Sequence, residues 1–143
     1  LSKTAGLAGL RVGFAFGNSI VIDIINRVTG PYDVNSFAVA AAFAALKDQT
    51  YIDFYVNEVL KARHWLKNTF EKYHVKYHID GGNYLLLWPK SDPKYVEKNL
   101  KSSGILIRNM DKKKHLKGSL RVSIGTTNQM KKFWEVFRII DKI

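Results

Sequence analysis

Hydrophobic residues recur at helical spacing in several parts of the chain, three or four positions apart. The predicted helices span residues 20–28, 37–46, 51–73 and 93–100, and a last one carries Met130, Phe133, Phe137 and Ile140 on one face. Asn18 or Ser19 is the expected cap of the first helix, and Thr127 or Asn128 of the last. The 37–46 stretch is nearly all Ala, Phe and Val, so this helix is expected to be buried on most sides.

A period of two marks the remaining hydrophobic positions. Val75, Tyr77 and Ile79 alternate with Lys76 and His78, as in a strand with one buried face. The predicted strands span residues 75–79, 84–88, 105–108 and 120–124. The sequence Asp80-Gly81-Gly82-Asn83 is a turn signal between the first two. Strands and helices mixed in this way predict a small α+β domain over residues 74–143, and the 49–73 stretch is expected to be a connecting helix.

Two arginines lie on the opposite side of their strands from the apolar positions. Leu120, Val122 and Ile124 share one face of the last strand, so Arg121 points the other way. Arg108 likewise lies opposite the apolar positions of the 105–108 strand. Each of the two strands therefore offers one arginine to solvent or to a cleft, and parity alone does not distinguish these two outcomes.

Composition sets broad limits. The 143 residues are 46% hydrophobic and 13% aromatic, which is enough for a real core. The chain contains no cysteine, which excludes a disulfide framework and a thiolate metal site, and it fits a reducing compartment such as the cytoplasm. No run of about 18 apolar residues indicates a membrane span. His74 and His78 stand four apart but in a predicted strand, so no metal site is expected.

The formal net charge of +11 is the most unusual feature of the composition. Such a charge suits a nucleic acid or another acidic partner. The densest patch is the run Lys112-Lys113-Lys114-His115-Leu116-Lys117. A charge run alone is weak evidence, so we interpret it as a solvated loop and expect no nucleic-acid partner; a basic binding module remains the alternative from another functional class.

The start of the chain carries candidate chemistry. It reads Ser2-Lys3-Thr4-Ala5-Gly6-Leu7-Ala8-Gly9-Leu10-Arg11-Val12-Gly13. Lys3 stands among Ser, Gly, Ala and Leu rather than in a charged run, and an apolar environment would disfavour its ammonium form. A lysine that loses its proton near neutrality forms Schiff bases with carbonyl groups. Arg11 and Ser2 offer a guanidinium and a hydroxyl, which suit a phosphate group.

This segment resembles the S-K-x-x-x-L-A-G-L-R-x-G pattern of pyridoxal-phosphate-dependent aminotransferases. The resemblance implies that Lys3 forms the Schiff base with pyridoxal 5′-phosphate and moves the substrate proton, and that Ser2 and Arg11 bind the cofactor phosphate. It also implies the α/β aminotransferase fold, with residues 1–48 ending the large cofactor-binding domain and residues 74–143 forming the small C-terminal domain. The rest of the large domain would lie upstream, so the chain is expected to be a partial enzyme that is inactive alone.

Three further segments resemble the histidinol-phosphate aminotransferase family. Residues 118–126, Gly-Ser-Leu-Arg-Val-Ser-Ile-Gly-Thr, are similar to its L-R-[IV]-[ST]-[IV]-G-T segment, which implies that Arg121 holds a substrate α-carboxylate. Residues 104–108 resemble its G-I-[LIV]-[LIV]-R segment, which implies that Arg108 binds the substrate phosphate. The 31–35 loop resembles P-[YF]-N-[VL]-[NS], with Asp33 in place of the usual Asn.

The resemblance implies a homodimeric enzyme of histidine biosynthesis. It would exchange an amino group between L-histidinol phosphate and 2-oxoglutarate, with glutamate as the other amino acid. Related enzymes on the same scaffold stay open as alternatives, namely an aromatic-amino-acid aminotransferase or a threonine-phosphate decarboxylase, because Arg108 favours a phosphorylated or acidic substrate without deciding which.

Overall fold

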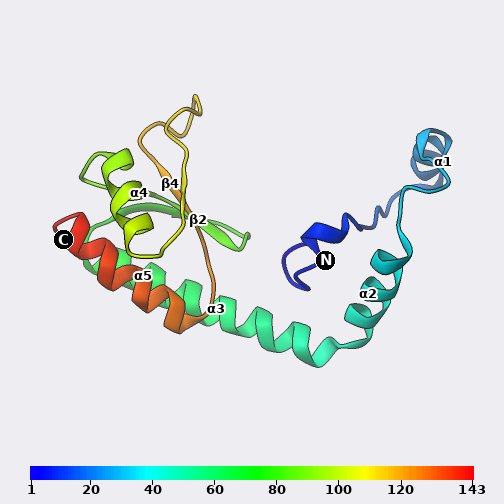
Figure 1. Cartoon of the computed structure of the whole chain (residues 1–143), viewed down its shortest axis with the longest axis horizontal. Helices are drawn as coiled ribbons and strands as arrows, with labels where there is room; N and C mark the ends of the chain where they lie inside the picture. The colour runs from blue at the N-terminus through cyan, green and yellow to red at the C-terminus, as the bar shows by residue number, and fades with distance from the viewer. The chain divides into compact units, whose positions relative to one another are not determined.

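A computed structural model describes all 143 residues, which divide into two compact units, Leu1–Val56 and Asn57–Ile143. The elements in chain order are η1 (Ala8–Leu10), α1 (Ser19–Val28), α2 (Ser36–Lys47), α3 (Gln49–Lys72), β1 (Lys76–Ile79), β2 (Tyr84–Trp88), α4 (Pro93–Ser102), β3 (Arg108–Asn109), β4 (Leu120–Ser123) and α5 (Thr127–Ile140) (Figure 1). The boundary between the units falls within α3, whose residues 57–72 belong to the second unit. No helix has the length and apolar character needed to cross a membrane.

The first unit has a small core. Val12, Ala38 and Ala42 are its buried residues, and Leu1 and Leu10 pack against them. The side chains of Asn18 and Asn35 accept hydrogen bonds from Ile20 N and Ala38 N and so cap α1 and α2, as the sequence predicts for α1.

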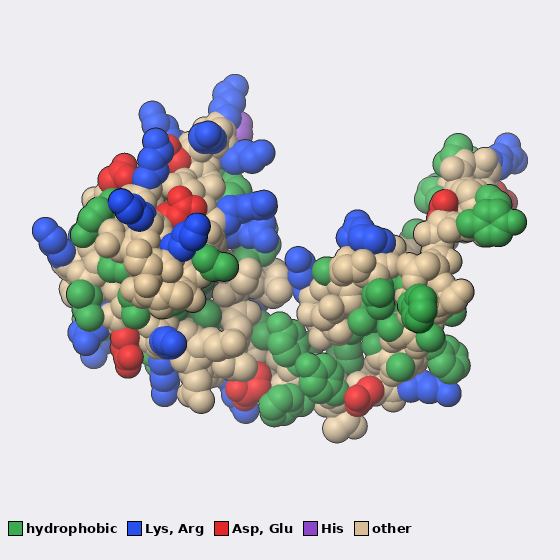
Figure 2. Space-filling model, viewed as in Figure 1, with side chains coloured by type: hydrophobic (Ala, Val, Ile, Leu, Met, Phe, Trp, Pro, Cys, Tyr) green, Lys and Arg blue, Asp and Glu red, His purple; other side chains and the backbone are tan.

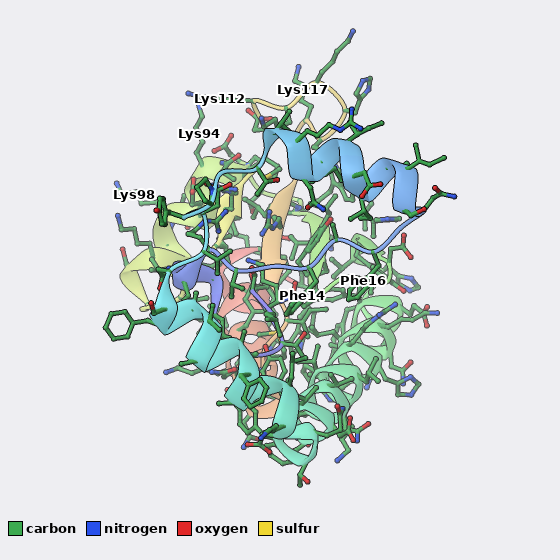
Figure 3. All side chains as sticks on the ribbon, turned by 90° about the vertical axis from the view of Figure 1, so that its right-hand side faces the viewer. Phe14, Phe16, Lys94, Lys98, Lys112 and Lys117 are labelled. Carbon is green, nitrogen blue, oxygen red and sulfur yellow. The ribbon has the colours of Figure 1, made fainter.

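The expectation that the 37–46 helix is buried on most sides is wrong. Only its alanines at 38 and 42 are buried, whereas Phe37 is 82% exposed. Phe16, in the segment before α1, is 92% exposed, and its ring centroid lies 6.2 Å from that of Phe14 (Figure 3). An apolar composition predicts burial only where other atoms cover the helix, and within this unit they do not.

The second unit is a four-stranded antiparallel sheet in the order β1-β2-β4-β3. Its core face carries Leu85, Leu87, Leu120 and Val122, and α3, α4 and α5 cover this one face (Figure 1). The helices contribute Leu66 and Phe70 from α3, Val96 and Leu100 from α4, and Phe133, Trp134 and Phe137 from α5 to the same core. No helix of this unit adds a core from the opposite face of the sheet, called the uncovered face below, on which Leu86 is 9% and Tyr84 is 43% exposed.

Two sequence predictions need correction beyond shifts of one or two residues in element bounds. The 105–108 strand is reduced to Arg108–Asn109, because Ile105 N donates to Leu100 O at the end of α4 and only two residues pair with β4. The last helix is capped by Thr126, one residue earlier than predicted. The Thr126 hydroxyl and the Gln129 side chain accept hydrogen bonds from each other's backbone N–H, which forms a capping box.

The C-terminus is tied to the segment before α4 by one carboxylate. Asp141 is 2% exposed, and its two oxygens accept hydrogen bonds from Lys90 N at 2.9 Å and Ser91 N at 2.7 Å. We expect Asp141→Ala to lower the free energy of unfolding by about 2 kcal/mol, because it removes a buried carboxylate that accepts two part-buried hydrogen bonds. Denaturant unfolding followed by tryptophan fluorescence measures this, since all three tryptophans lie in the second unit. Asp80→Ala, an exposed change in the β1–β2 turn, is the control and should stay within about 0.5 kcal/mol of the parent.

Candidate active site

The N-terminal motif forms a surface turn in the first unit. Ala5 N and Leu7 N both donate to Leu1 O, at 3.2 and 3.3 Å, and this closes the turn around the Ser2-Lys3 pair. Ser2 is half-buried and Lys3 is exposed. No protein group forms a hydrogen bond or ion pair with the Lys3 amine. The neighbours of Lys3 in sequence therefore leave its amine free, and the expectation that they surround it with an apolar environment is wrong for this unit.

Arg11 follows η1 in the left-handed backbone conformation, at φ 55°. Its Nη1 donates to Ala8 O at 3.2 Å, so the guanidinium folds back over the end of η1. This contact uses one of its five N–H donors and leaves the others for a ligand. Gly6 adopts φ 69°, and a β-carbon at Gly6 or Gly9 would meet no atom within 4 Å, so the surface of the turn is open.

The second group of candidate residues lies on the uncovered face of the sheet. His78 of β1 pairs with Leu86 of β2, Leu86 pairs with Arg121 of β4, and Arg121 pairs with Arg108 of β3. Directly paired residues point to the same side of a sheet, so the prediction that both arginines lie opposite the apolar face is confirmed. Sequence reasoning missed that the two arginines are direct cross-strand partners, since only the strand order and register reveal it.

Neither arginine is neutralised by the protein. The two ion pairs of the second unit, Lys61–Glu58 and Lys67–Glu71, involve neither of them, and no side chain accepts a hydrogen bond from either guanidinium. Like charges on directly opposite residues destabilise a sheet. An anionic ligand that binds both guanidinium groups would remove this repulsion, which makes the pair a candidate anion site.

The surroundings of the two arginines differ. The guanidinium carbon of Arg121 lies 4.7 Å from the ring centroid of Tyr84, a cation–π distance. Arg108 instead lines a pocket of about 550 Å³ between α4 and the segment after β3. Its lining also includes Lys94, Glu97, Asn109, Met110, Asp111, Lys112 and Lys113. Asp111 is already engaged there, because its Oδ1 accepts a hydrogen bond from Gly118 N at 2.8 Å.

The whole net charge of the chain belongs to the second unit. Residues 57–143 contain nineteen Lys and Arg and eight Asp and Glu, a balance of +11, whereas residues 1–56 contain four of each sign. The basic side chains are spread over the second unit in Figure 2, and Lys94, Lys98, Lys112 and Lys117 point away from the ribbon in Figure 3. Such a field attracts anionic small molecules to the arginine pair.

The remaining titratable residues do not form a site. No three His, Asp or Glu side chains gather in a group that could hold a metal ion. Tyr77, on the core face of β1, has its pKa raised by burial and by the hydrogen bond that its hydroxyl donates to Glu71 Oε1 at 2.9 Å. This pair links α3 to the sheet and lies opposite the face that carries the arginines.

Comparison with known proteins identifies the chain. The family described as aminotransferase class I and II matches residues 1–137. The curated histidinol-phosphate aminotransferase of Clostridium beijerinckii is 33% identical over 98% of this chain, which spans 40% of that protein. Among solved structures, the histidinol-phosphate aminotransferase of Clostridium acetobutylicum superposes with a TM-score of 0.85 at 21% identity, over 99% of this chain and 44% of that one.

The structure of the Sinorhizobium meliloti histidinol-phosphate aminotransferase, solved in complex with pyridoxal-5′-phosphate, has a TM-score of 0.79 at 22% identity. It covers 99% of this chain and 39% of that one. These structural matches confirm the predicted fold, part of the α/β aminotransferase fold. The chain spans about 40% of the length of the curated relatives it matches. The family match and the curated relative together show that the chain belongs to the class I and II aminotransferases.

Proposed function

We propose that these residues are part of a pyridoxal-phosphate-dependent enzyme, a histidinol-phosphate aminotransferase of histidine biosynthesis. It exchanges an amino group between L-histidinol phosphate and 2-oxoglutarate. The observation that carries the proposal is the cross-strand pair Arg108–Arg121, two guanidinium groups that no protein carboxylate pairs with, on an uncovered sheet face. The similarity to curated histidinol-phosphate aminotransferases supports the choice of reaction.

The donor groups of the N-terminal turn fit pyridoxal 5′-phosphate. A free primary amine suits its aldehyde, and the Ser2 hydroxyl and the Arg11 guanidinium suit its phosphate. Lys3, Ser2 and Arg11 would therefore hold the cofactor. When bound, the cofactor supplies a carbonyl that takes up the amino group and a ring that accepts electrons from the substrate.

The Lys3 Nζ has two roles in this proposal. It would hold the cofactor by a covalent link, and as a free amine it would move a proton between substrate atoms. Within the first unit Lys3 is exposed, so the atoms that would exclude water around its amine would lie outside this unit.

The two arginines divide the recognition of two different substrates. Arg121 binds the α-carboxylate of glutamate or 2-oxoglutarate, a group that histidinol phosphate lacks. Arg108 binds the phosphate of histidinol phosphate and assists with the distal carboxylate of glutamate. Planar guanidinium groups bind both kinds of anion through paired hydrogen bonds.

The partner of this chain in catalysis is the remainder of the enzyme. We propose that residues 1–48 complete the large cofactor-binding domain, that 49–73 form the connecting helix, and that 74–143 form the small domain. The many exposed apolar side chains of the first unit support burial against further protein, including a second copy in a cytoplasmic homodimer. Phe16, Val28, Phe37 and Phe43 are among them.

Substrate preference tests the proposal. In the complete enzyme loaded with cofactor, Arg108→Gln should raise KM for histidinol phosphate by about 10- to 100-fold and change KM for unphosphorylated histidinol little, because a charge-assisted contact to phosphate is lost. Steady-state kinetics with the two donors measures this difference. Activity with phenylalanine or tyrosine instead of histidinol phosphate would indicate an aromatic-amino-acid aminotransferase. Release of CO₂ from threonine phosphate would indicate a threonine-phosphate decarboxylase.

A further inference from the structure

Tyr84 is the first residue of β2 and lies on the same uncovered face as the arginines. It pairs with Ser123 of β4, two residues along that strand from Arg121. Its side chain is 43% exposed, and its ring centroid lies 4.7 Å from the Arg121 guanidinium carbon. The Tyr84 ring is therefore a diagonal cross-strand neighbour of Arg121 from β2. On the other edge of β4, Arg108 of β3 is the direct cross-strand neighbour of Arg121.

The Tyr84 ring makes a cation–π contact with the Arg121 guanidinium. No carboxylate pairs with Arg121, and no protein acceptor takes its N–H groups. A long side chain without such partners loses much rotamer freedom when a ligand fixes it. Attraction to the ring reduces this freedom before binding and leaves the N–H donors for a planar anion.

The position of the ring is itself restricted by the preceding turn. A β-carbon at Gly82 would lie 3.1 Å from Tyr84 Cε1, so the ring packs closely against the turn. The Tyr84 hydroxyl forms no hydrogen bond with the protein, so the aromatic ring alone makes the contact with Arg121.

We propose that Tyr84 is a positioning residue, whose ring holds the Arg121 guanidinium in the orientation that receives a substrate carboxylate. The Gly82 turn lies against one edge of this ring. This inference rests on the proposed function of Arg121 as the group that binds the α-carboxylate of glutamate and 2-oxoglutarate.

Calorimetric binding of glutarate, an unreactive dicarboxylate, to the cofactor-loaded complete enzyme tests the proposal without relying on turnover. Tyr84→Leu should raise the Kd by about 3- to 20-fold, the loss expected for a cation–π contact. Tyr84→Phe keeps the ring and should stay within about twofold of the parent. Gly82→Ala should push the ring edge by a few tenths of an ångström and weaken binding less than Tyr84→Leu does but in the same direction, which keeps the test decisive if Tyr84→Leu lowers the melting temperature.

A double-mutant cycle separates positioning from general damage. In an Arg121→Gln background, Tyr84→Leu should change the Kd by less than about twofold, because the group that it positions is gone. An equal loss in both backgrounds, or an equal loss in Tyr84→Phe and Tyr84→Leu, would overturn the role of the ring. If Arg121→Gln itself leaves glutarate binding unchanged, the proposed function of Arg121 fails, a result distinct from failure of Tyr84 alone.

Discussion

Lys3→Ala is expected to reduce transamination by the complete, cofactor-loaded enzyme by on the order of 10⁴-fold, because both the covalent hold on the cofactor and the proton-moving amine are lost. The cofactor phosphate would still be bound by Ser2 and Arg11, so the variant should retain cofactor weakly and lose it on dialysis. Activity assays and cofactor content after dialysis measure the two effects separately. A small added amine, such as methylamine, should restore part of the activity by replacing the proton-moving group.

The matched control is Lys47→Ala, another exposed lysine of the first unit, which lies over the Phe43 ring rather than in the N-terminal turn. It should change activity by less than about twofold. If Lys3→Ala retained full turnover and bound cofactor as firmly as the parent, the assignment of the N-terminal motif would be wrong.

Arg121→Gln is expected to impair the two half-reactions unequally. With glutamate or 2-oxoglutarate, KM should rise by about 10- to 100-fold, since a charge-assisted paired contact to the carboxylate disappears. With histidinol phosphate the loss should be much smaller, because that substrate has no carboxylate. Single-turnover measurements of each half-reaction resolve the difference.

Arg138→Gln is the control for charge, because it removes an exposed arginine of α5 from the same basic unit. A similar KM increase in the Arg121 and Arg138 variants would attribute the effect to the overall field. An equal effect of Arg121→Gln on both half-reactions would contradict a role confined to the carboxylate.

Local signals in the sequence were sufficient for most elements of the fold. Asn18, one of the two caps predicted for the first helix, caps α1; the Asp92 side chain caps α4, and Pro89 follows the last residue of β2. The failures concern interactions with distant residues. The length of β3 depends on which residues of β4 it pairs with, and the burial of α2 depends on atoms outside the helix. The periodicity of a segment contains neither kind of information.

In the candidate site, too, local sequence signals predicted some features, whereas contacts between distant residues were missed. Strand parity predicted the side on which Arg108 and Arg121 lie, because side chains alternate strictly along a strand. The pairing of Arg108 with Arg121 and the ring of Tyr84 beside Arg121 depend on strand order and register, which parity does not define. The exposure of Lys3 was also missed, because its apolar neighbours in sequence do not become its neighbours in space.

The strand order of the second unit also determines when it folds during protein synthesis. β2 is central, but one of its two partners, β4, ends at Ser123, and α5 completes the core only at Ile140. Asp141 then joins the segment before α4 across about fifty residues of sequence. On the ribosome, β1, β2 and α4 therefore emerge when only α3 is present to pack against their apolar faces. Translation stalled before residue 120 would leave part of these faces exposed to chaperones and proteases, whereas release of residues 120–141 completes the core.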